Sequence, residues 1–304
     1  MDYFKNWDEV IQSVKGRPGV KRVAVAAAGE EHTLEAVTKV MRDGLVDPLL
    51  VGDKAEIARI LKRLGTSVSE ENIYDKPDFA EAAAFAVQLV HEGKADFLMK
   101  GMLDTSILLR AVVNKETGLG TGKLMCIINF LVIPRYHKML VVTDAGMVMY
   151  PTLEQKKALI ETAVSVLRNM GYAKPKVAVL AAIEKVNPKM PETVEADALK
   201  QMNLSGEIAD CIVEGPISMD LAMTKSISAT KKYDSPVAGN PDILIFPNIQ
   251  AGNIAIKTMT ELAGAVSAGV VVGAKVPIVL TSRGASSEEK YLSLVLAAGS
   301  AGKQ

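Results

Sequence analysis

The most constraining feature of this sequence is the alternation of short, apolar, β-branched runs with longer segments of helical periodicity. Residues 21–29 (KRVAVAAAG) predict a buried strand, and residues 30–45 after them show the periodicity of an amphipathic helix. The pattern repeats with a strand at 47–54 and a helix closed by Gly65, and again where a helix runs into a strand at 96–99. Strands and helices that alternate in this way predict βαβ units, and therefore a parallel sheet with helices on both faces.

The second half of the chain continues this alternation. A strand that ends at 143–146 leads into a long helix with Pro151 near its start and Gly171 past its end, as helix-boundary preferences favour. Residues 209–223 predict a strand, a Gly-Pro turn and the start of a helix, and residues 241–265 predict a strand, a loop and a helix. One more strand and one more helix are predicted to close the chain.

Composition narrows the class of function. The chain has 304 residues, which is enough for two domains or one large domain. Its 35 basic and 35 acidic residues give no net charge, so a nucleic acid is not an expected partner. No apolar run reaches the length of a transmembrane helix, and the N-terminus lacks the regions of a signal peptide. We therefore expect a cytoplasmic protein without a membrane partner.

The sequence does not indicate a metal or nucleotide cofactor. Cys126 and Cys211 lie in apolar runs and are predicted to be small buried residues, and no His is spaced as a metal ligand from another His or Cys. Segment 117–123 departs from the phosphate-loop motif, because Thr117 replaces the first Gly and Leu124 replaces the residue that holds magnesium. No G-x-G-x-x-G motif opens a βαβ unit. We expect no metal site and no tightly bound cofactor.

Polar and small residues follow the predicted strands. Ligands of open α/β sheets bind beyond the carboxyl ends of the strands, so these positions are the first candidates for a binding site. Their mixture of hydroxyl, amide and cationic groups suits an anionic ligand of modest size. The positions are Lys100-Gly101, Thr143-Asp144-Ala145-Gly146, Glu214-Gly215-Pro216, Pro247-Asn248 and Thr281-Ser282-Arg283-Gly284.

Two segments that follow predicted strands have a structural explanation beside the functional one. Gly252 and Asn253 are predicted to precede a helix, where free N–H groups bind an anion, but Asn253 is equally suited to cap that helix. Asp104 or Thr105 is a possible cap for the helix after residue 100, where Lys100 alone could be a solvated charge. The functional alternative there is a phosphate contact made by Lys100, Thr105 and Ser106.

The end of the last predicted strand carries an arginine. A guanidinium at the mouth of a buried strand is costly unless it is paired or faces a ligand, and its fork geometry matches phosphate. Ser286 or Ser287 can cap the last helix, which places Glu288 and Glu289 in its first turn, where acids favour the helix dipole. One of these two acids could also face Arg283 and act as a base.

These segments resemble the phosphate acyltransferase family, which comprises phosphotransacetylases and phosphate butyryltransferases. The spacing agrees over nearly the whole chain, and the total length and the segment GAKVPIVLTSR are more similar to phosphate butyryltransferases. The motifs that carry the resemblance are KGMLDTS (100–106), VTDAGMVMYPT (142–152), EGPISMDLA (214–222), PDILIFPNIQAGNIAIK (241–257) and VPIVLTSRGASSEEK (276–290).

The resemblance implies an activity and an architecture. Acyl-CoA and phosphate would give acyl phosphate and CoA, with coenzyme A as a substrate and no covalent acyl-enzyme, which fits the lack of a visible nucleophile set. The implied fold class is α/β, with two three-layer domains and an inter-domain cleft, similar to isocitrate and isopropylmalate dehydrogenases. The C-terminal segment would return to the first domain, so the predicted domains are 1–137 with 277–304, and 138–276. A homo-oligomer is also implied.

The resemblance also implies residue roles. Arg283, helped by Ser282, would bind phosphate and stabilise charge on the carbonyl oxygen. Phosphotransacetylases carry an Asp base six positions after this arginine, where this chain has Glu289, while Glu288 fits the butyrate-type pattern SRxxSxE. The choice between these two acids stays open, and the resemblance matches Arg110 to a second family arginine near the CoA or phosphate. The substrate-binding candidates are Lys100, Thr105, Ser106, Arg110, Asp144, Asn248, Gly252 and Asn253.

Alternatives to a butyryltransferase remain at this point. They are a phosphate acetyltransferase, a non-catalytic acyl-CoA-sensing domain of the transacetylase type, and a decarboxylating dehydrogenase of related two-domain architecture. Retention of Ser282, Arg283 and an acid argues against the sensor. The lack of clustered aspartates for a divalent metal argues against the dehydrogenase.

Overall fold

The structure is a computed structural model of the chain, and it describes residues 3–282 and 284–301. The chain divides into two compact units, which are treated separately below. The N-terminal unit comprises Trp7–Met125 with Ala268–Gln304, and the central unit comprises Met1–Asn6 with Cys126–Ser267. The domain limits predicted from the sequence, after residues 137 and 276, stay a prediction.

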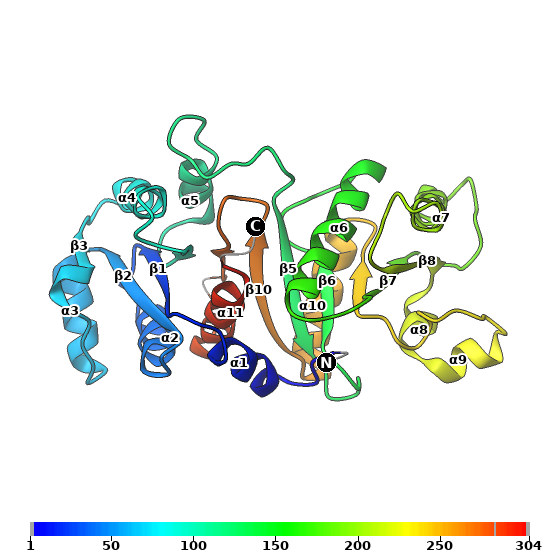
Figure 1. Cartoon of the computed structure of the whole chain (residues 1–304), viewed down its shortest axis with the longest axis horizontal. Helices are drawn as coiled ribbons and strands as arrows, with labels where there is room; N and C mark the ends of the chain where they lie inside the picture. The colour runs from blue at the N-terminus through cyan, green and yellow to red at the C-terminus, as the bar shows by residue number, and fades with distance from the viewer. Residues whose placement is uncertain (1–2, 283, 302–304) are drawn as a thin grey trace. The chain divides into compact units, whose positions relative to one another are not determined.

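The sheet of the N-terminal unit is mostly parallel. The pairs from β3 to β11 are parallel, and β10 runs antiparallel to β11. The last strand of the chain, β11, pairs with β4, so the C-terminal segment lies beside the first hundred residues. The strand order is β3 (Ile73–Asp75), β2 (Val46–Gly52), β1 (Lys21–Ala26), β4 (Phe97–Lys100), β11 (Ile278–Val279) and β10 (Val266–Val272) (Figure 1).

Helices pack on both faces of this sheet. The crossovers β1-α2-β2 and β3-α4-β4 run in opposite directions along the sheet, so right-handed connections put α2 and α4 on opposite faces. Helix α2 contacts α3 and α11, whereas α4 contacts α5. Helix α11 is buried from Lys290 to Gly299, as expected for a helix covered on several sides. The helices are α1 (Trp7–Lys15), α2 (Glu31–Arg42), α3 (Lys54–Arg63), η1 (Glu70–Asn72), α4 (Phe79–His91), α5 (Thr105–Val112) and α11 (Ser287–Ser300).

The central unit has a mixed sheet of its own. Strand β5 is antiparallel to β6, and the pairs β6–β9, β9–β7 and β7–β8 are parallel. The strands in spatial order are β5 (Cys126–Val132), β6 (Leu140–Thr143), β9 (Ile243–Ile245), β7 (Lys176–Leu180) and β8 (Ile212–Ile217). The helices are α6 (Leu153–Asn169), α7 (Pro191–Leu204), α8 (Met219–Met223), α9 (Lys225–Thr230) and α10 (Ile249–Ala263).

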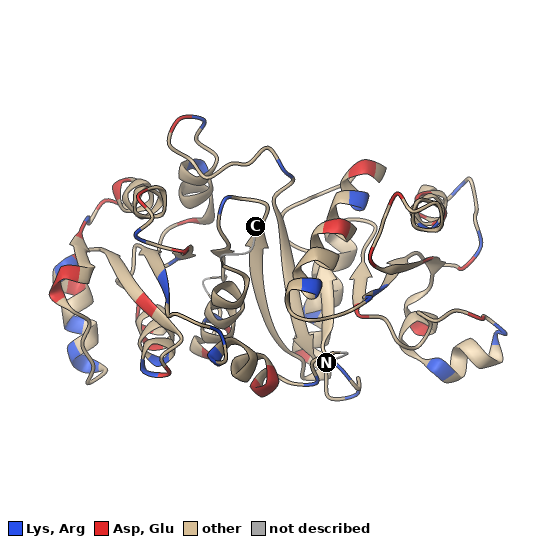
Figure 2. Ribbon diagram, viewed as in Figure 1, with Lys and Arg blue, Asp and Glu red and all other residues tan. Residues whose placement is uncertain are grey.

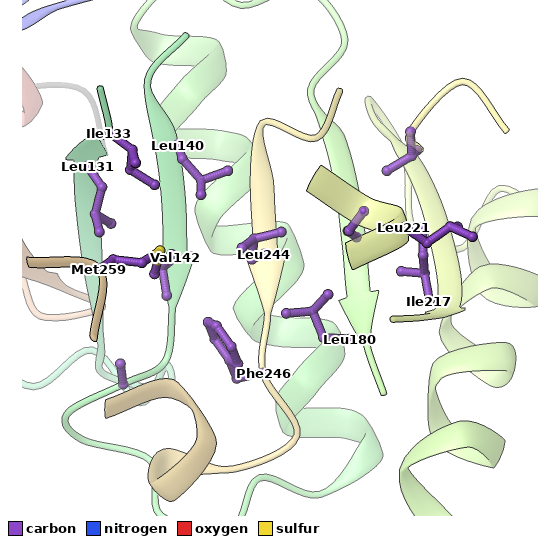
Figure 3. Packing of buried hydrophobic residues seen from close by; sticks show 14 of the residues in the cluster. Leu131, Ile133, Leu140, Val142, Leu180, Ile217, Leu221, Leu244, Phe246 and Met259 are labelled. Atoms are coloured by element: carbon purple, nitrogen blue, oxygen red, sulfur yellow. The ribbon is translucent and has the colours of Figure 1, made fainter. Parts of the chain in front are cut away.

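One hydrophobic cluster joins the strands of the central unit to its helices. Side chains from β5, β6, β9, β7 and β8 meet residues of α8 and α10 in this cluster (Figure 3). Leu140, Val142, Leu244 and Ile217 are fully buried. Burying an aliphatic side chain of this size contributes about 1.5–3 kcal/mol, so the cluster stabilises the unit substantially.

Two sequence predictions about local structure were wrong. The Gly-Pro pair at 215–216 is not a turn but lies inside β8, at the edge of the sheet, where a residue without an N–H is tolerated. Gly252 and Asn253 do not precede the following helix but lie within it. Asn248 caps that helix instead, since its side chain accepts a hydrogen bond from the Ala251 N–H at 3.1 Å.

Other predictions agree with the structure. The α/β class is confirmed, although the antiparallel pairs β5–β6 and β10–β11 correct the expectation of a purely parallel sheet. Both cysteines are buried and free. Basic and acidic residues are interspersed along the helices of each unit (Figure 2). Within the described residues no helix is long and apolar enough to cross a membrane.

A buried ion pair ties together the starts of three strands in the central unit. Lys138 Nζ lies 2.5 Å from Asp242 Oδ1, and the two side chains are only 2% and 7% exposed. Asp242 Oδ2 also accepts a hydrogen bond from the Lys176 N–H at 2.7 Å. Burial lowers the pKa of Lys138 while Asp242 raises it, and the net direction is downward. Each of these two buried charges is therefore stabilised by the other, and removing one side chain leaves the other charge without its partner.

We expect Lys138→Met to destabilise the protein by about 3–5 kcal/mol, because it leaves the Asp242 carboxylate buried without its cation. The double variant Lys138→Met/Asp242→Asn should recover much of this loss, since the amide oxygen can still accept the Lys176 N–H. Urea unfolding of the full chain measures both. A double variant as unstable as the single variant would contradict this account.

Candidate functional site

The ends of three neighbouring strands in the N-terminal unit bring three loops to one edge of the sheet. Ala26 at the end of β1 is in register with Lys100 at the end of β4, and Val279 of β11 is in register with Met99. The loops that follow these strands therefore leave the sheet side by side, at the edge where α/β proteins bind ligands.

The loops after β1 and β4 lie directly on each other. The N–H groups of Gly101 and Met102 donate to the carbonyl oxygens of Ala26 and Ala27, both at 2.8 Å. A Cβ at residue 101 would lie 2.8 Å from the Ala26 oxygen and closer still to the Ala27 oxygen. Only glycine allows this approach, so the backbone after Lys100 is fixed by its neighbour.

These loops, together with the starts of α2, α4 and α11, surround a small cavity. Its volume is about 250 Å³, which suits a small anion better than a whole acyl-CoA molecule. Among the described lining residues, two lysines and one glutamate are charged, and two apolar side chains are about half-exposed. The lining residues are Glu30, Phe79, Lys100, Gly101, Met102, Ser282 and Lys290.

Lys100 supplies a buried ammonium group at this cavity. The residue is 4% exposed, and its Nζ donates to the carbonyl oxygens of Gly101 at 3.1 Å and Leu103 at 3.2 Å. These two carbonyl oxygens help to solvate the buried ammonium group. The prediction that Lys100 faces an anion stays a prediction, and its place in the cavity wall fits that role.

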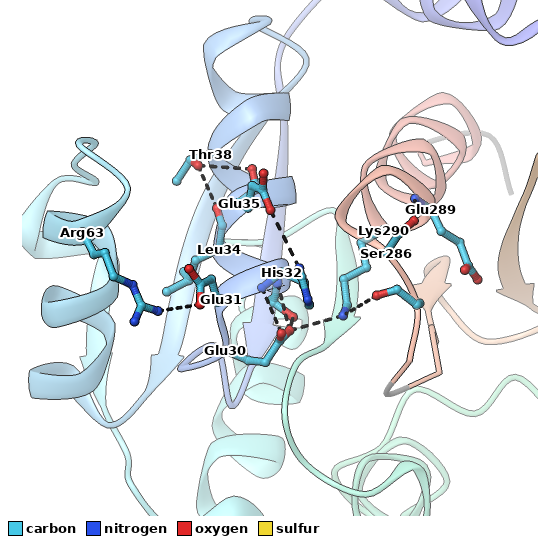
Figure 4. Close-up of polar contacts among 12 residues, drawn as sticks. Glu30, Glu31, His32, Leu34, Glu35, Thr38, Arg63, Ser286, Glu289 and Lys290 are labelled. Atoms are coloured by element: carbon cyan, nitrogen blue, oxygen red, sulfur yellow. Dashed lines mark hydrogen bonds and ion pairs between the residues drawn. The ribbon is translucent and has the colours of Figure 1, made fainter.

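Glu30 and Lys290 form an ion pair across the same wall. Glu30 caps α2, accepting hydrogen bonds from the N–H groups of His32 at 2.9 Å and Thr33 at 2.8 Å. Lys290 reaches from α11 to Glu30 Oε2 at 3.2 Å and to the Ala285 carbonyl oxygen at 3.3 Å (Figure 4). Burial raises the pKa of Glu30. The hydrogen bonds from Thr33 and His32 and the Lys290 charge together lower this pKa by more than burial raises it, so the net shift is downward.

The turn between β11 and α11 carries the predicted catalytic residues. Ser282 is exposed and lines the cavity, while Arg283 lies outside the described residues. Ser286 caps α11 by accepting a hydrogen bond from the Glu289 N–H at 3.1 Å, as one of the two predicted caps. Glu288 is exposed, whereas Glu289 is half-buried.

The two candidate acids differ in their surroundings. Burial raises the pKa of Glu289, and the neighbouring Lys290 charge offsets this only in part. Figure 4 shows the Glu289 side chain pointing away from Glu30, while Lys290 points toward it. A carboxylate with a raised pKa is a better match to a thiol proton than one with the ordinary value.

The candidates on α5 are separate from this cavity wall. Thr105 and Ser106 are exposed in the first turn of the helix, after Asp104 at the N-cap position. Arg110 is exposed in the last turn. Among the described residues, the cavity lining does not include these three side chains.

The central unit gathers the remaining candidates at the end of β6. The Asp144 carboxylate is buried and accepts hydrogen bonds from the N–H groups of Ile127, Gly146 and Met147, at 2.8, 2.7 and 2.7 Å. A Cβ at Gly252 would lie 2.9 Å from the Asp144 carbonyl oxygen.

Helix α10 is held against the same loop. The Asn253 side chain donates from Nδ2 to the Ala145 carbonyl oxygen at 3.2 Å. Gly252 and Asn253 therefore fix the start of α10 on the β6 loop, and Asn248 caps the helix. The hydrogen bonds described here for these residues are to backbone groups within the unit, and substrate contact stays a prediction for them.

Sequence reasoning missed four residues of the cavity wall, which are Glu30, Phe79, Met102 and Lys290. Three of them had a signal. Met102 follows β4 by two residues, so the strand-end rule applies to it. Glu30 follows the first strand by four residues, so the strand-end rule would have included it. Lys290 lies one helical turn after the cap Ser286, which puts the two residues on one face of α11.

Several known proteins are similar to this chain over nearly its whole length. Residues 76–298 match the family model described as phosphate acetyl/butaryl transferase. The chain is 43% identical to a phosphate acetyltransferase of Thermotoga maritima, covering 96% of this chain and 98% of that protein. It is 40% identical to a phosphate butyryltransferase of Clostridium acetobutylicum, with coverages of 99% and 100%. A crystal structure of a branched-chain phosphotransacylase from Enterococcus faecalis has a TM-score of 0.81 at 30% identity, covering 94% and 100%.

Gly101→Ala tests the contact that fixes the loop after β4. The added methyl group meets backbone that cannot move aside, and we expect a loss of about 1–3 kcal/mol or more in the free energy of unfolding. Gly120→Ala is the matched control, because a Cβ there meets open space, and its change should stay within about 0.5 kcal/mol. Equal effects in urea unfolding would show that the close approach is unimportant.

Proposed function

The chain belongs to the phosphate acetyl/butaryl transferase family, and on this basis we propose that it catalyses reversible acyl transfer between coenzyme A and inorganic phosphate. In this reaction a phosphate oxygen forms a bond to the acyl carbon, the thioester bond breaks, and the sulfur leaves as CoA. The preferred substrate in this proposal is a short acyl chain such as butyryl, with acetyl as the alternative. Relatives with both names are about equally similar to this chain.

The observation that carries the proposal is the anion-sized cavity at the strand ends. It lies in a segment that the family match covers for all but one of its lining residues, Glu30. Among the described lining residues, Lys100 and Lys290 carry two formal positive charges and Glu30 carries one negative charge. Phosphate and acyl phosphate are both small anions, and a positive wall favours both.

In the proposed mechanism Lys100 and Ser282 bind the phosphate group. Arg283 is assigned to the same group by the family resemblance, and its fork of donors can also stabilise charge on the carbonyl oxygen. Thr105, Ser106 and Arg110 are candidates for contacts to the rest of the substrates. The central-unit residues Asp144, Asn248, Gly252 and Asn253 remain candidates as well, with Asp144 acting through the loop that it fixes.

Glu289 is the proposed base for the CoA thiol in the direction of acyl-CoA formation. Ionising a thiol with a pKa near 8.5 costs about 2 kcal/mol at pH 7, so a nearby proton acceptor helps. The raised pKa of Glu289 favours it over the exposed Glu288.

A covalent route through cysteine is disfavoured. Burial and the nearby Asp144 raise the pKa of Cys126 to about 12, and burial raises the pKa of Cys211 to about 11. Neither thiol would supply a thiolate at neutral pH. This supports direct transfer between the two substrates.

The proposal includes the finer architecture expected of the family. This architecture consists of two three-layer α/β domains of the isocitrate dehydrogenase type, with a predicted cleft between them. The proposed domains are residues 1–137 with 277–304, and residues 138–276. A homo-oligomer, a cytoplasmic location and the lack of a tightly bound cofactor are likewise part of the proposal.

The first test is phosphate-dependent release of free CoA thiol from acetyl-, propionyl-, butyryl- and isobutyryl-CoA. We expect release with a preference for butyryl-CoA, and a loss of about 10²–10³ in kcat for Arg283→Ala, because a donor to the developing charge is removed. If no acyl-CoA releases thiol although calorimetry shows acyl-CoA binding, the enzyme hypothesis is rejected in favour of a non-catalytic acyl-CoA-sensing domain. An acetyl-CoA preference would select the acetyltransferase alternative.

The second test separates the two acids by Glu289→Gln and Glu288→Gln. Glutamine cannot accept the thiol proton, so we expect Glu289→Gln to slow acyl-CoA formation by about 10²–10⁴-fold. In the wild type the same rate should fall as the pH decreases through the raised pKa of Glu289. Exposed Glu288 serves as the control, and a larger rate loss in Glu288→Gln would reassign the base.

Stability should move in the opposite direction to activity for Glu289→Gln. A folded-state pKa above the unfolded value gives stability that is present below the unfolded pKa and lost as pH rises through the folded pKa. Glutamine mimics the neutral acid at every pH, so the variant should be more stable than wild type at pH 8 but not at low pH. Urea unfolding at both pH values checks this.

A further inference from the structure

We infer that Lys290 is a positioning residue for phosphate, which acts by cancelling the charge of Glu30 on the cavity wall. The inference rests on the proposed function, because it concerns the phosphate of that same reaction. It names a residue outside the roles assigned above to Lys100, Ser282, Arg283 and Glu289.

The contacts of Lys290 join two segments that are distant in the sequence. Its ammonium group is 4% exposed and donates both to Glu30, at the start of α2, and to the Ala285 carbonyl oxygen, in the turn before α11. The Ala285 N–H in turn donates to the Ser282 carbonyl oxygen at 3.2 Å. One ammonium group thus connects the N-terminus of α2 to the turn that carries Ser282.

Glu30 creates the need for this cation. Its carboxylate satisfies two N–H groups at the start of α2, and these hydrogen bonds keep it ionised. The same carboxylate lines the cavity, where an uncompensated negative charge would repel a phosphate dianion. The Lys290 ammonium removes this repulsion while leaving the cap intact.

Helix capping does not explain Lys290. Ser286 already caps α11, and a cation in the first turn of a helix is unfavourable to the helix dipole. Replacing both members of a buried ion pair by neutral groups is often harmless, whereas removing one member is costly. The phosphate-binding role and a purely structural role therefore predict different results for single and double variants.

The experiment measures binding of inorganic phosphate by calorimetry, together with KM for phosphate and kcat in thiol release. The variants are Lys290→Met, Glu30→Gln and the double variant. We expect Lys290→Met to weaken phosphate binding about tenfold or more, because Glu30 is left unpaired. The double variant should return to within about threefold of wild type, and Glu30→Gln should bind phosphate as tightly as wild type or more tightly.

Lys156→Met is the matched control. Lys156 is a lysine of the central unit with an equally buried side chain, and it is also paired with a glutamate, Glu195. We expect this variant to change the unfolding temperature without changing phosphate affinity. A phosphate affinity that simply followed stability across all four variants would overturn the positioning role.

Other outcomes also decide the inference. Phosphate affinity within threefold of wild type in folded Lys290→Met, or a double variant as weak as Lys290→Met, would overturn it. If Lys290→Met does not fold, the phosphate affinity of Glu30→Gln tests the inference instead. Tenfold weaker phosphate binding by Glu30→Gln would contradict the charge argument. Wild-type protein that binds phosphate but releases no thiol would refute the proposed reaction. The phosphate affinities of the variants would still test the role of Lys290. Wild-type protein that binds no phosphate would overturn the inference itself.

Discussion

The approach of Gly101 to the carbonyl oxygens of Ala26 and Ala27 is the constraint on which the candidate site depends. Two loop backbones can touch in this way only where one of them lacks a Cβ. The two N–H groups of residues 101 and 102 are satisfied there, so the loop cannot shift without leaving buried donors unpaired. Lys100 precedes this contact directly, and its ammonium group is therefore held at a fixed place on the cavity wall.

Charge balance on this wall follows from a requirement of secondary structure. Helix α2 begins beside the cavity, and its first N–H groups need an acceptor, which Glu30 provides. A carboxylate is a strong cap, but its charge is unfavourable for a cavity that is proposed to bind an anion. Lys290 resolves this conflict from another helix, so the net charge of the wall depends on residues 260 positions apart in the sequence.

The sequence was sufficient for the α/β class and for most strands and helices, because the apolar periodicity changes wherever an element ends. It located Ser282 and Lys100 correctly at strand ends, since the rule for open sheets needs only strand order along the chain. It missed Met102 because only the polar and small residues after each strand were chosen, and it missed Phe79 because the short strand β3 before it was not predicted. The start of α10 was misplaced because Gly252 signals a helix boundary in sequence, whereas here it permits close contact with the β6 loop.

Two glutamates near the cavity have pKa values moved in opposite directions, and this separates their roles. Hydrogen bonds from α2 and the Lys290 charge outweigh burial and lower the pKa of Glu30, which keeps it an anion and makes it a poor proton acceptor. Burial raises the pKa of Glu289, which brings it closer to the pKa of a thiol. A carboxylate that must stay ionised for the fold cannot also accept the proton, so the proposed mechanism assigns the base to Glu289 and not to Glu30.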